Sequence, residues 1–311
     1  MLLLALAFRL ALGSEAGGLA RLAGSFVAPL GDTLAWLALA CALLGGSFAA
    51  GAARFRDLLR GAGIAASYGA LLRGYLVAGF FNLVLPGAIL GDAYRVWDVR
   101  QGTGRGSEAL GIVALERLVS LVALALLAAA AVPFLPLSPE LGWVRAALAG
   151  SAGACLAASV LALHPAGIAL ARGALGRAPW LPLRAAVVGG RALDALEALA
   201  ARPRALASAF AWSAVAQGLT VLAVFCLGMP LGAPVAFPWY AAIVPSVALL
   251  ATLPVSIGGA GVREVLYVAC FGAVGMRPEA ALALSLAVLA ASLVWGGAGL
   301  AVFLAGRRKP A

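Results

Sequence analysis

The chain has 311 residues, of which 64% are hydrophobic and 11% are charged, and its mean hydropathy is +1.05. This balance excludes a soluble domain of this size, and no polar stretch is long enough to form one. Apolar runs of about 20 residues recur along the sequence, and each is long enough to cross a bilayer. We therefore predict an all-α, polytopic integral membrane protein that forms a single domain over residues 1–311.

The net charge of +10 comes almost entirely from arginine, since Lys309 is the only lysine. The basic residues lie between apolar runs, which is typical of cytoplasmic loops beside anionic lipid rather than of a nucleic-acid surface. The four cysteines are isolated from one another, and His164 is the only histidine. Neither pattern matches a metal site, so we expect no metal, no other cofactor and no nucleic-acid partner.

The first part of the chain is predicted to contain the following elements, in order: a short or incomplete span at 1–12, an interfacial helix at 15–30, a clear span at 32–51, a broken helix at 74–91, a polar segment at 92–107, a span at 109–131, a turn at 133–142 and a span at 143–163. The broken helix is predicted because only about 12 apolar residues precede Pro86, which is too few to cross a bilayer.

The second part is predicted to continue with a basic, partly amphipathic segment at 164–204, a span at 205–227, an uncharged loop at 228–238, a second broken helix at 239–257, a returning segment at 258–278 and a last span at 279–305. Together the two parts give about 6–8 membrane helices, including two re-entrant or broken hairpins.

Residues 85–95 and 253–263 look like two copies of one segment. They align without gaps, and five of the eleven positions are identical, including a proline and an arginine nine residues apart. Broken backbone at membrane depth is tolerated only where protein covers it or a watery cavity meets it. Paired breaks in the two halves of a transporter point to its substrate site.

The positive-inside rule places the arginine-rich segments 54–73, 92–107 and 164–204 in the cytoplasm, together with the C-terminus. The first broken hairpin then enters from the cytoplasmic side and the second from the outer side. We therefore predict an inverted repeat, with halves at about 32–131 and 205–305, in a bacterial-type inner membrane.

Four residues are candidates for binding a lipid headgroup. Arg95 and Arg263 follow the two breaks, and a guanidinium matches phosphate or carboxylate, although snorkelling to the interface is the alternative. Glu116 and Arg117 lie inside a span, where ionisable groups are costly and usually paired or functional. Adjacent helical residues point about 100° apart, so each needs its own partner. We expect Glu116 to pair with Arg95 or Arg263 and Arg117 to face the phosphate; a structural ion pair is the alternative.

Two carboxylates, Asp92 and Glu264, neighbour the repeated arginines and are candidates for gating or coupling. Each would pair with its neighbouring arginine when no lipid is bound; an exposed carboxylate at the interface is the alternative. Asn82 and Gln217 are expected to form interhelical hydrogen bonds; the alternative for Asn82 is to bind backbone groups freed by the break. The residues predicted to shape the cavity are Asn82, Pro86, Gly87, Gly91, Pro254, Gly258, Gly259 and Gly261.

Nothing in the sequence indicates ATP hydrolysis or other catalysis. The glycine-rich strings at 102–106 and 258–261 lack the Lys-Ser/Thr of a phosphate loop. We therefore expect that the protein is not an enzyme and that transport is passive or coupled to an ion gradient, with Glu116 as the candidate proton carrier.

Several strings resemble the lysylphosphatidylglycerol synthase transmembrane family, also called flippase-like. They are 80–87, Gly91-Asp92 with Arg95, 115–118 and 253–264, and the resemblance covers roughly residues 30–305. It implies a flippase domain, which in the best-known members moves aminoacylated phosphatidylglycerol to the outer leaflet. Those members also carry an aminoacyl-transferase domain. This sequence contains none, so we expect no lipid synthesis; stand-alone relatives are linked to other lipids, including polyprenyl-linked sugars and hopanoids.

We therefore predict a flippase or transporter that moves an anionic or aminoacylated phospholipid, or a polyprenyl-linked lipid, between leaflets. Its partners would be the membrane lipid and, if present, a separately encoded lipid-modifying enzyme; small residues on several spans also permit homo-oligomers. The first alternative is a non-catalytic scaffold of a lipid-modifying enzyme or glycosyltransferase. An integral-membrane transferase is disfavoured because the outer loops have almost no carboxylates, and a small-solute carrier is a third alternative.

Overall fold

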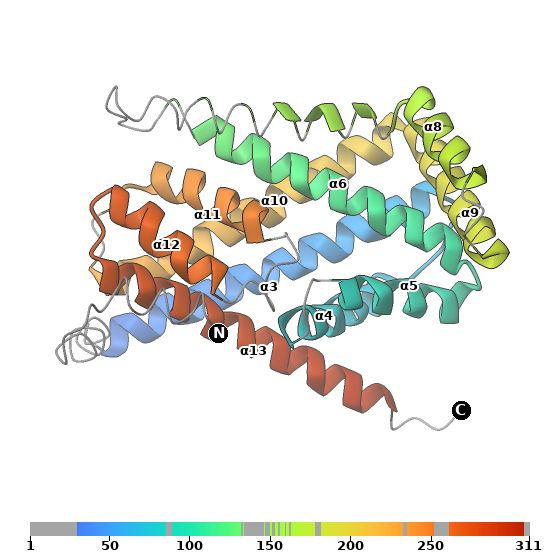
Figure 1. Ribbon diagram of the computed structural model, residues 1–311. Helices are drawn as coiled ribbons and strands as arrows, with labels where there is room; N and C mark the ends of the chain where they lie inside the picture. Colours follow the sequence, from blue (N-terminus) through green and yellow to red (C-terminus); the bar gives the residue numbers. More distant parts are fainter. Residues whose placement is uncertain are drawn as a thin grey trace.

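The computed structural model describes residues 30–84, 89–131, 163–177, 182–232, 235–251 and 261–307, with individual positions between 133 and 161. Over this described part the regular structure is entirely helical, which confirms the all-α prediction. Four described helices are long and apolar enough to cross a membrane. They are α3 (Leu30–Gly61), α6 (Gly106–Ala131), α10 (Pro203–Gly228) and α13 (Pro278–Arg307), shown in Figure 1.

Helix α3 is longer than the sequence predicted. The expected span was 32–51, with a cytoplasmic segment beginning at Arg54, but the helix continues for ten more residues to Gly61. The loop assignment was therefore wrong over 54–61. Ala50 and Leu58 lie one turn before and after Arg54, and both are buried. They continue the packed face of the helix, so burial of that face outweighs the charge of the arginine side chain.

Two pairs of short helices flank the long ones. Helices α4 (Tyr68–Val84) and α5 (Ile89–Thr103) pack against each other, as do α11 (Phe237–Ala251) and α12 (Val262–Ala273). The segment predicted to be polar, 92–107, is therefore mostly helical. In Figure 1 the α4–α5 pair lies towards one end of the long helices and the α11–α12 pair towards the other.

The two hairpins predicted from the sequence would contain these pairs of short helices. The segments that connect them, 85–88 and 252–260, lie outside the described residues. The re-entrant hairpins and the inverted repeat therefore stay predictions.

The basic segment 164–204 forms two helices, α8 (Pro165–Gly176) and α9 (Leu183–Ala200). Proline begins α8, α10 and α13, a position where its missing N–H costs the helix nothing. Helix α9 lies against α6. This approach is close because Gly111 leaves no side chain between α6 and the Ala192 carbonyl of α9.

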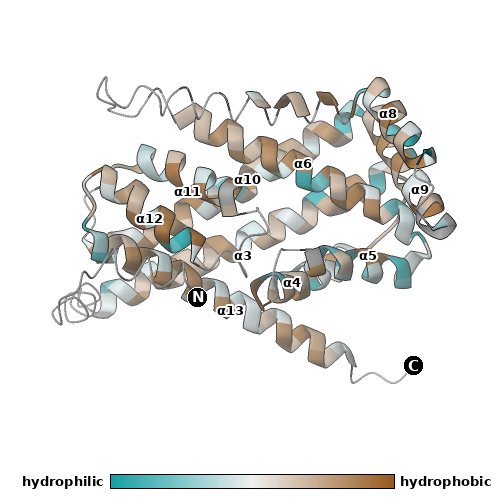
Figure 2. Cartoon of the chain, viewed as in Figure 1, coloured by the Kyte–Doolittle hydropathy of each residue, from teal (hydrophilic) through white to brown (hydrophobic). Residues whose placement is uncertain are grey.

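The buried residues form two main hydrophobic clusters. One joins α10, α11, α12 and α13, with Tyr240 and Phe271 among its largest members. The other joins α3, α6 and α9 with parts of α4 and α5, and it includes Phe55 and Ile112. Figure 2 shows mostly hydrophobic residues along the long helices, with hydrophilic residues gathered on α5 and on the part of α6 beside it.

Some predicted elements and residues fall outside the described part of the chain. They are the elements at 1–12 and 15–30, most of the span at 143–163, and the breakers Pro86, Gly87, Pro254, Gly258 and Gly259.

Candidate functional site

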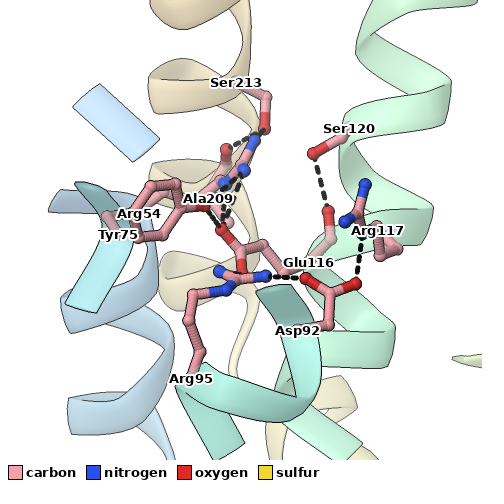
Figure 3. Close-up of polar contacts among 9 residues, drawn as sticks. All are labelled: Arg54, Tyr75, Asp92, Arg95, Glu116, Arg117, Ser120, Ala209 and Ser213. Atoms are coloured by element: carbon pink, nitrogen blue, oxygen red, sulfur yellow. Dashed lines mark hydrogen bonds and ion pairs between the residues drawn. The ribbon is translucent and has the colours of Figure 1, made fainter. Parts of the chain in front are cut away.

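Glu116 is the centre of a buried charged cluster. Its residue is 1% exposed, and it lies about 15 Å along α6 from Gly106, at 1.5 Å per residue. The Arg54 Nε and Nη2 atoms donate to Glu116 Oε1 at 3.1 and 2.8 Å, and Arg95 Nη1 donates to Oε2 at 2.5 Å. The Tyr75 hydroxyl also donates to Oε1. Helices α3, α4, α5 and α6 thus meet at one carboxylate (Figure 3).

Arg54 was not among the residues singled out from the sequence. It is 7% exposed, and besides binding Glu116 it donates from Nη1 to Ser213 Oγ at 2.8 Å and from Nη2 to the Tyr75 hydroxyl at 3.1 Å. Its nitrogens therefore join α3 to α10 and α4 as well as to α6. The sequence does contain one sign that Arg54 is buried, because the residues four positions before and after it, on the same face of a helix, are apolar.

Arg95 is held on three sides. It is 5% exposed, and its Nη2 donates to Asp92 Oδ1 at 2.6 Å, one turn earlier on α5. The guanidinium carbon lies 4.6 Å from the centre of the Tyr75 ring and 5.0 Å from that of Phe55. Cation–π contacts of this kind strengthen where water is excluded. The arginine is thus oriented by its surroundings rather than extended toward the interface.

Asp92 links the cluster to Arg117. Its second oxygen, Oδ2, accepts from Arg117 Nε at 2.6 Å, and the Arg117 side chain is 41% exposed. The pairing of Glu116 with Arg95 was predicted and is confirmed. Glu116 and Arg117 also have separate partners, as expected, whereas the expectation that Arg117 faces a lipid phosphate stays a prediction. Three guanidiniums surround two carboxylates, so the five side chains carry a formal charge of +1.

A cavity of about 470 Å³ opens beside these groups. Its lining includes all five charged side chains, Arg54, Asp92, Arg95, Glu116 and Arg117. This volume falls within the range of natural small-molecule sites, roughly 300–1,000 Å³. A net positive cavity among membrane-crossing helices is suited to an anionic group, because arginine forks match phosphate and carboxylate oxygens.

A second cavity, of about 370 Å³, adjoins the first. The two share six lining residues, including Arg54, Asn82 and Gln217. Among the described residues that line the second cavity, Arg54 is the only one with a charged side chain. The rest of the polar lining consists of hydroxyl, amide and indole groups, contributed by Ser47, Tyr75, Asn82, Gln217, Thr220, Ser292 and Trp295.

Asn82 and Gln217 behave differently. Asn82 Oδ1 accepts from the Gly91 N–H at 3.2 Å, which joins α4 to α5 and confirms the alternative, that Asn82 binds backbone near the break. Gly91 permits this approach, because a side chain there would meet Asn82 and the Ala78 carbonyl. Gln217 was expected to bond between helices, but within the described part of the chain its amide has no hydrogen bond and lines both cavities.

Arg263 lies in a separate cluster on α12 and α13. Its Nη2 donates to Glu264 Oε1 at 3.0 Å and its Nε to Ser285 Oγ at 3.1 Å. Glu264 also caps α12, since Oε2 accepts from the Gly261 N–H at 2.5 Å. Gly261 has φ +86°, which glycine adopts without strain. Arg263 lines neither cavity, so the structure does not bring the two repeated arginines together.

Glu264 and Asp92 each pair with the neighbouring repeated arginine, as predicted, while their gating role stays a prediction. Among the described residues, no group of three or more His, Cys, Asp and Glu side chains is placed to hold a metal ion.

Comparison with known proteins places this architecture in a family. No curated protein and no solved structure matches the chain. The family described as the lysylphosphatidylglycerol synthase TM region matches residues 2–299, which is nearly the whole sequence. This family is a membrane domain with a lipid-related function, and its membrane character agrees with the four long apolar helices that the structure describes. The chain belongs to the lysylphosphatidylglycerol synthase transmembrane family.

Proposed function

We propose that the protein moves a lipid with an anionic headgroup between the leaflets of a bacterial-type inner membrane, with its C-terminus in the cytoplasm. The observation that carries this proposal is the cavity lined by Arg54, Arg95 and Arg117 beside the buried Glu116. Charged side chains are expensive at membrane depth and are retained chiefly where they serve a pathway or a site. Transport rather than catalysis suits a lining in which each carboxylate already binds arginine.

The proposal assigns a role to each charged group. Arg95 and Arg117 would bind the headgroup, and Asp92 would hold both of them when no lipid is present. Glu116 would act as a fixed counter-ion, because Arg54, Arg95 and Tyr75 already donate to its two oxygens. This arrangement argues against Glu116 as a proton carrier in the conformation seen. Arg263 would serve the opposite face, as the repeated segments suggest.

A leaflet-exchange assay tests the proposal. Purified protein is reconstituted in liposomes with fluorescent phosphatidylglycerol or phosphatidylcholine, and Arg95→Ala and Arg263→Ala are compared with the wild type. Arg60→Ala is the matched control, since Arg60 is exposed near the end of α3. We expect rapid exchange of the anionic lipid by the wild type and by the control, and loss in both test variants.

Two outcomes contradict parts of this proposal. Exchange that survives both substitutions would show that the repeated arginines do not bind the headgroup. No exchange of any lipid by correctly folded protein would instead favour the alternative, a membrane scaffold for a separately encoded lipid-modifying enzyme. In that case the surface formed by α8 and α9 should be required for association and Arg95 should be dispensable.

A further inference from the structure

We infer that the second cavity is a subsite for an uncharged, hydroxyl-bearing part of the headgroup, so that the preferred lipid is a polyol or sugar phosphodiester rather than one carrying an ammonium group. This inference rests on the proposed function and narrows its substrate class. It follows from the difference between the two adjoining cavities, of which one is charged and the other is almost free of charge.

Part of the hydrogen-bonding capacity of this subsite is unused, although Ser47 and Thr220 are hydrogen-bonded to each other and Trp295 donates to the Cys41 carbonyl. The Gln217 amide is without a hydrogen bond among the described residues, and it offers both donors and an acceptor at the junction of the two cavities. Asn82 uses only its oxygen, which leaves its amide nitrogen available. Ser292 donates to the Val288 carbonyl at 2.7 Å, so its oxygen can still accept. Paired donors and acceptors of this kind match hydroxyl groups.

The same lining is unfavourable for an ammonium group. Within the part of the chain that the structure describes, no carboxylate lines the second cavity. The two carboxylates of the first cavity are both held by guanidiniums, since Glu116 binds Arg54 and Arg95, and Asp92 binds Arg95 and Arg117. An ammonium entering here would meet a net positive cluster without a vacant counter-charge. A neutral hydroxylated group avoids that repulsion and still fills the polar space.

The position of the subsite fits one molecule that occupies both cavities. Because Arg54, Asn82 and Gln217 line both, a phosphodiester against the arginines would place its esterified alcohol toward Ser292 and Thr220. The phosphate would then determine affinity through its charge. The amides would determine selectivity, because a polar group left unpaired on the lipid or on the protein costs binding energy.

A binding experiment isolates the hydroxyl groups. The full-length protein in detergent is mixed with equal amounts of phosphatidylglycerol and phosphatidylethanol, which share the phosphodiester charge but differ in hydroxyls, and bound lipid is measured by native mass spectrometry. We expect the wild type to prefer phosphatidylglycerol about twofold to tenfold, the factor that one hydrogen bond of about 0.5–1.5 kcal/mol provides. Lysylphosphatidylglycerol and phosphatidylethanolamine should bind more weakly than phosphatidylglycerol.

The variants test which residues cause the preference. Gln217→Leu should bring the binding ratio of the two phosphodiesters close to one. Ser292→Ala should also lower this ratio, and it replaces Gln217→Leu as the test variant if that variant does not fold. Ser246→Ala is the matched control, because Ser246 likewise donates to a carbonyl four residues earlier, at 2.7 Å, but lines neither cavity.

Equal binding of the two phosphodiesters by the wild type, or tightest binding of an ammonium-bearing lipid, would overturn the inference. Failure of the proposed function would be distinguishable from failure of this inference. In that case no lipid would exchange between the leaflets, whatever the ratio in which the two phosphodiesters bind.

Discussion

The guanidinium of Arg54 and the carboxylate of Glu116 form a buried ion pair between α3 and α6, with Nη2 2.8 Å from Oε1. The two residues are 62 positions apart, and neither side chain is more than 8% exposed. Such a pair is weak evidence for stability, because desolvation offsets much of the attraction. Its position beside a cavity makes a role in binding the better explanation for its presence in an apolar bundle.

Removing Arg54 should destabilise the protein. The change Arg54→Gln leaves Glu116 with Arg95 and Tyr75 only, and breaking a buried pair costs about 3–5 kcal/mol. Thermal unfolding in detergent, followed by tryptophan fluorescence, measures the effect. Arg60→Gln, at an exposed position on the same helix, should leave the melting temperature unchanged. Equal melting temperatures for both variants and the wild type would contradict the prediction.

The Arg54–Glu116 pair should show energetic coupling. Glu116→Gln alone leaves two buried guanidiniums, Arg54 and Arg95, with less counter-charge than they have now. Combining it with Arg54→Gln removes one of those guanidiniums, so the double variant should be more stable than the sum of the single changes predicts. We expect a coupling free energy of about 0.5–3 kcal/mol, measured by a double-mutant cycle of unfolding. Additive single changes would show that the pair does not interact in solution.

Neutralising Asp92 should increase the affinity for anionic lipid. Asp92→Asn keeps the shape of the side chain but releases Arg95 and Arg117 from a competing carboxylate. Titration of phosphatidylglycerol, monitored by native mass spectrometry, should show tighter binding that weakens with added salt. Glu108→Gln, which breaks only an ion pair with Arg105, is the control. Weaker binding after Asp92→Asn would mean that Asp92 supports the site instead of competing for its arginines.

Close packing of α4 on α13 depends on Gly299. A methyl group at this position would meet the carbonyl of Leu76, whereas one at Gly297 would meet nothing within 4 Å. Gly299→Ala should therefore destabilise the protein by about 1–3 kcal/mol, as overpacking does. Gly297→Ala, on the same helix, should be neutral or slightly stabilising because alanine favours helix over glycine. Comparable melting temperatures for the two variants would show that the contact relaxes without cost.

The membrane character of this chain followed from composition alone, because an apolar run of sufficient length has one favourable environment. The partner of Glu116 was also predictable in part. A buried charge needs an opposite charge, and Arg95 was one of two candidates. The other candidate, Arg263, could not be excluded by spacing, because both arginines occupy the same position of the repeated segment. The structure separates them by placing Arg263 against Glu264 and Ser285.

Arg54 shows most clearly what the sequence did not decide. In the sequence it is the first of several arginines after an apolar run, and such residues usually mark a cytoplasmic loop. Its burial depends on Glu116, Ser213 and Tyr75, three side chains from three other helices. Local pattern therefore determined that the chain forms apolar helices. Only tertiary packing decided which charged groups share a cavity, because each needs partners that are distant in the sequence.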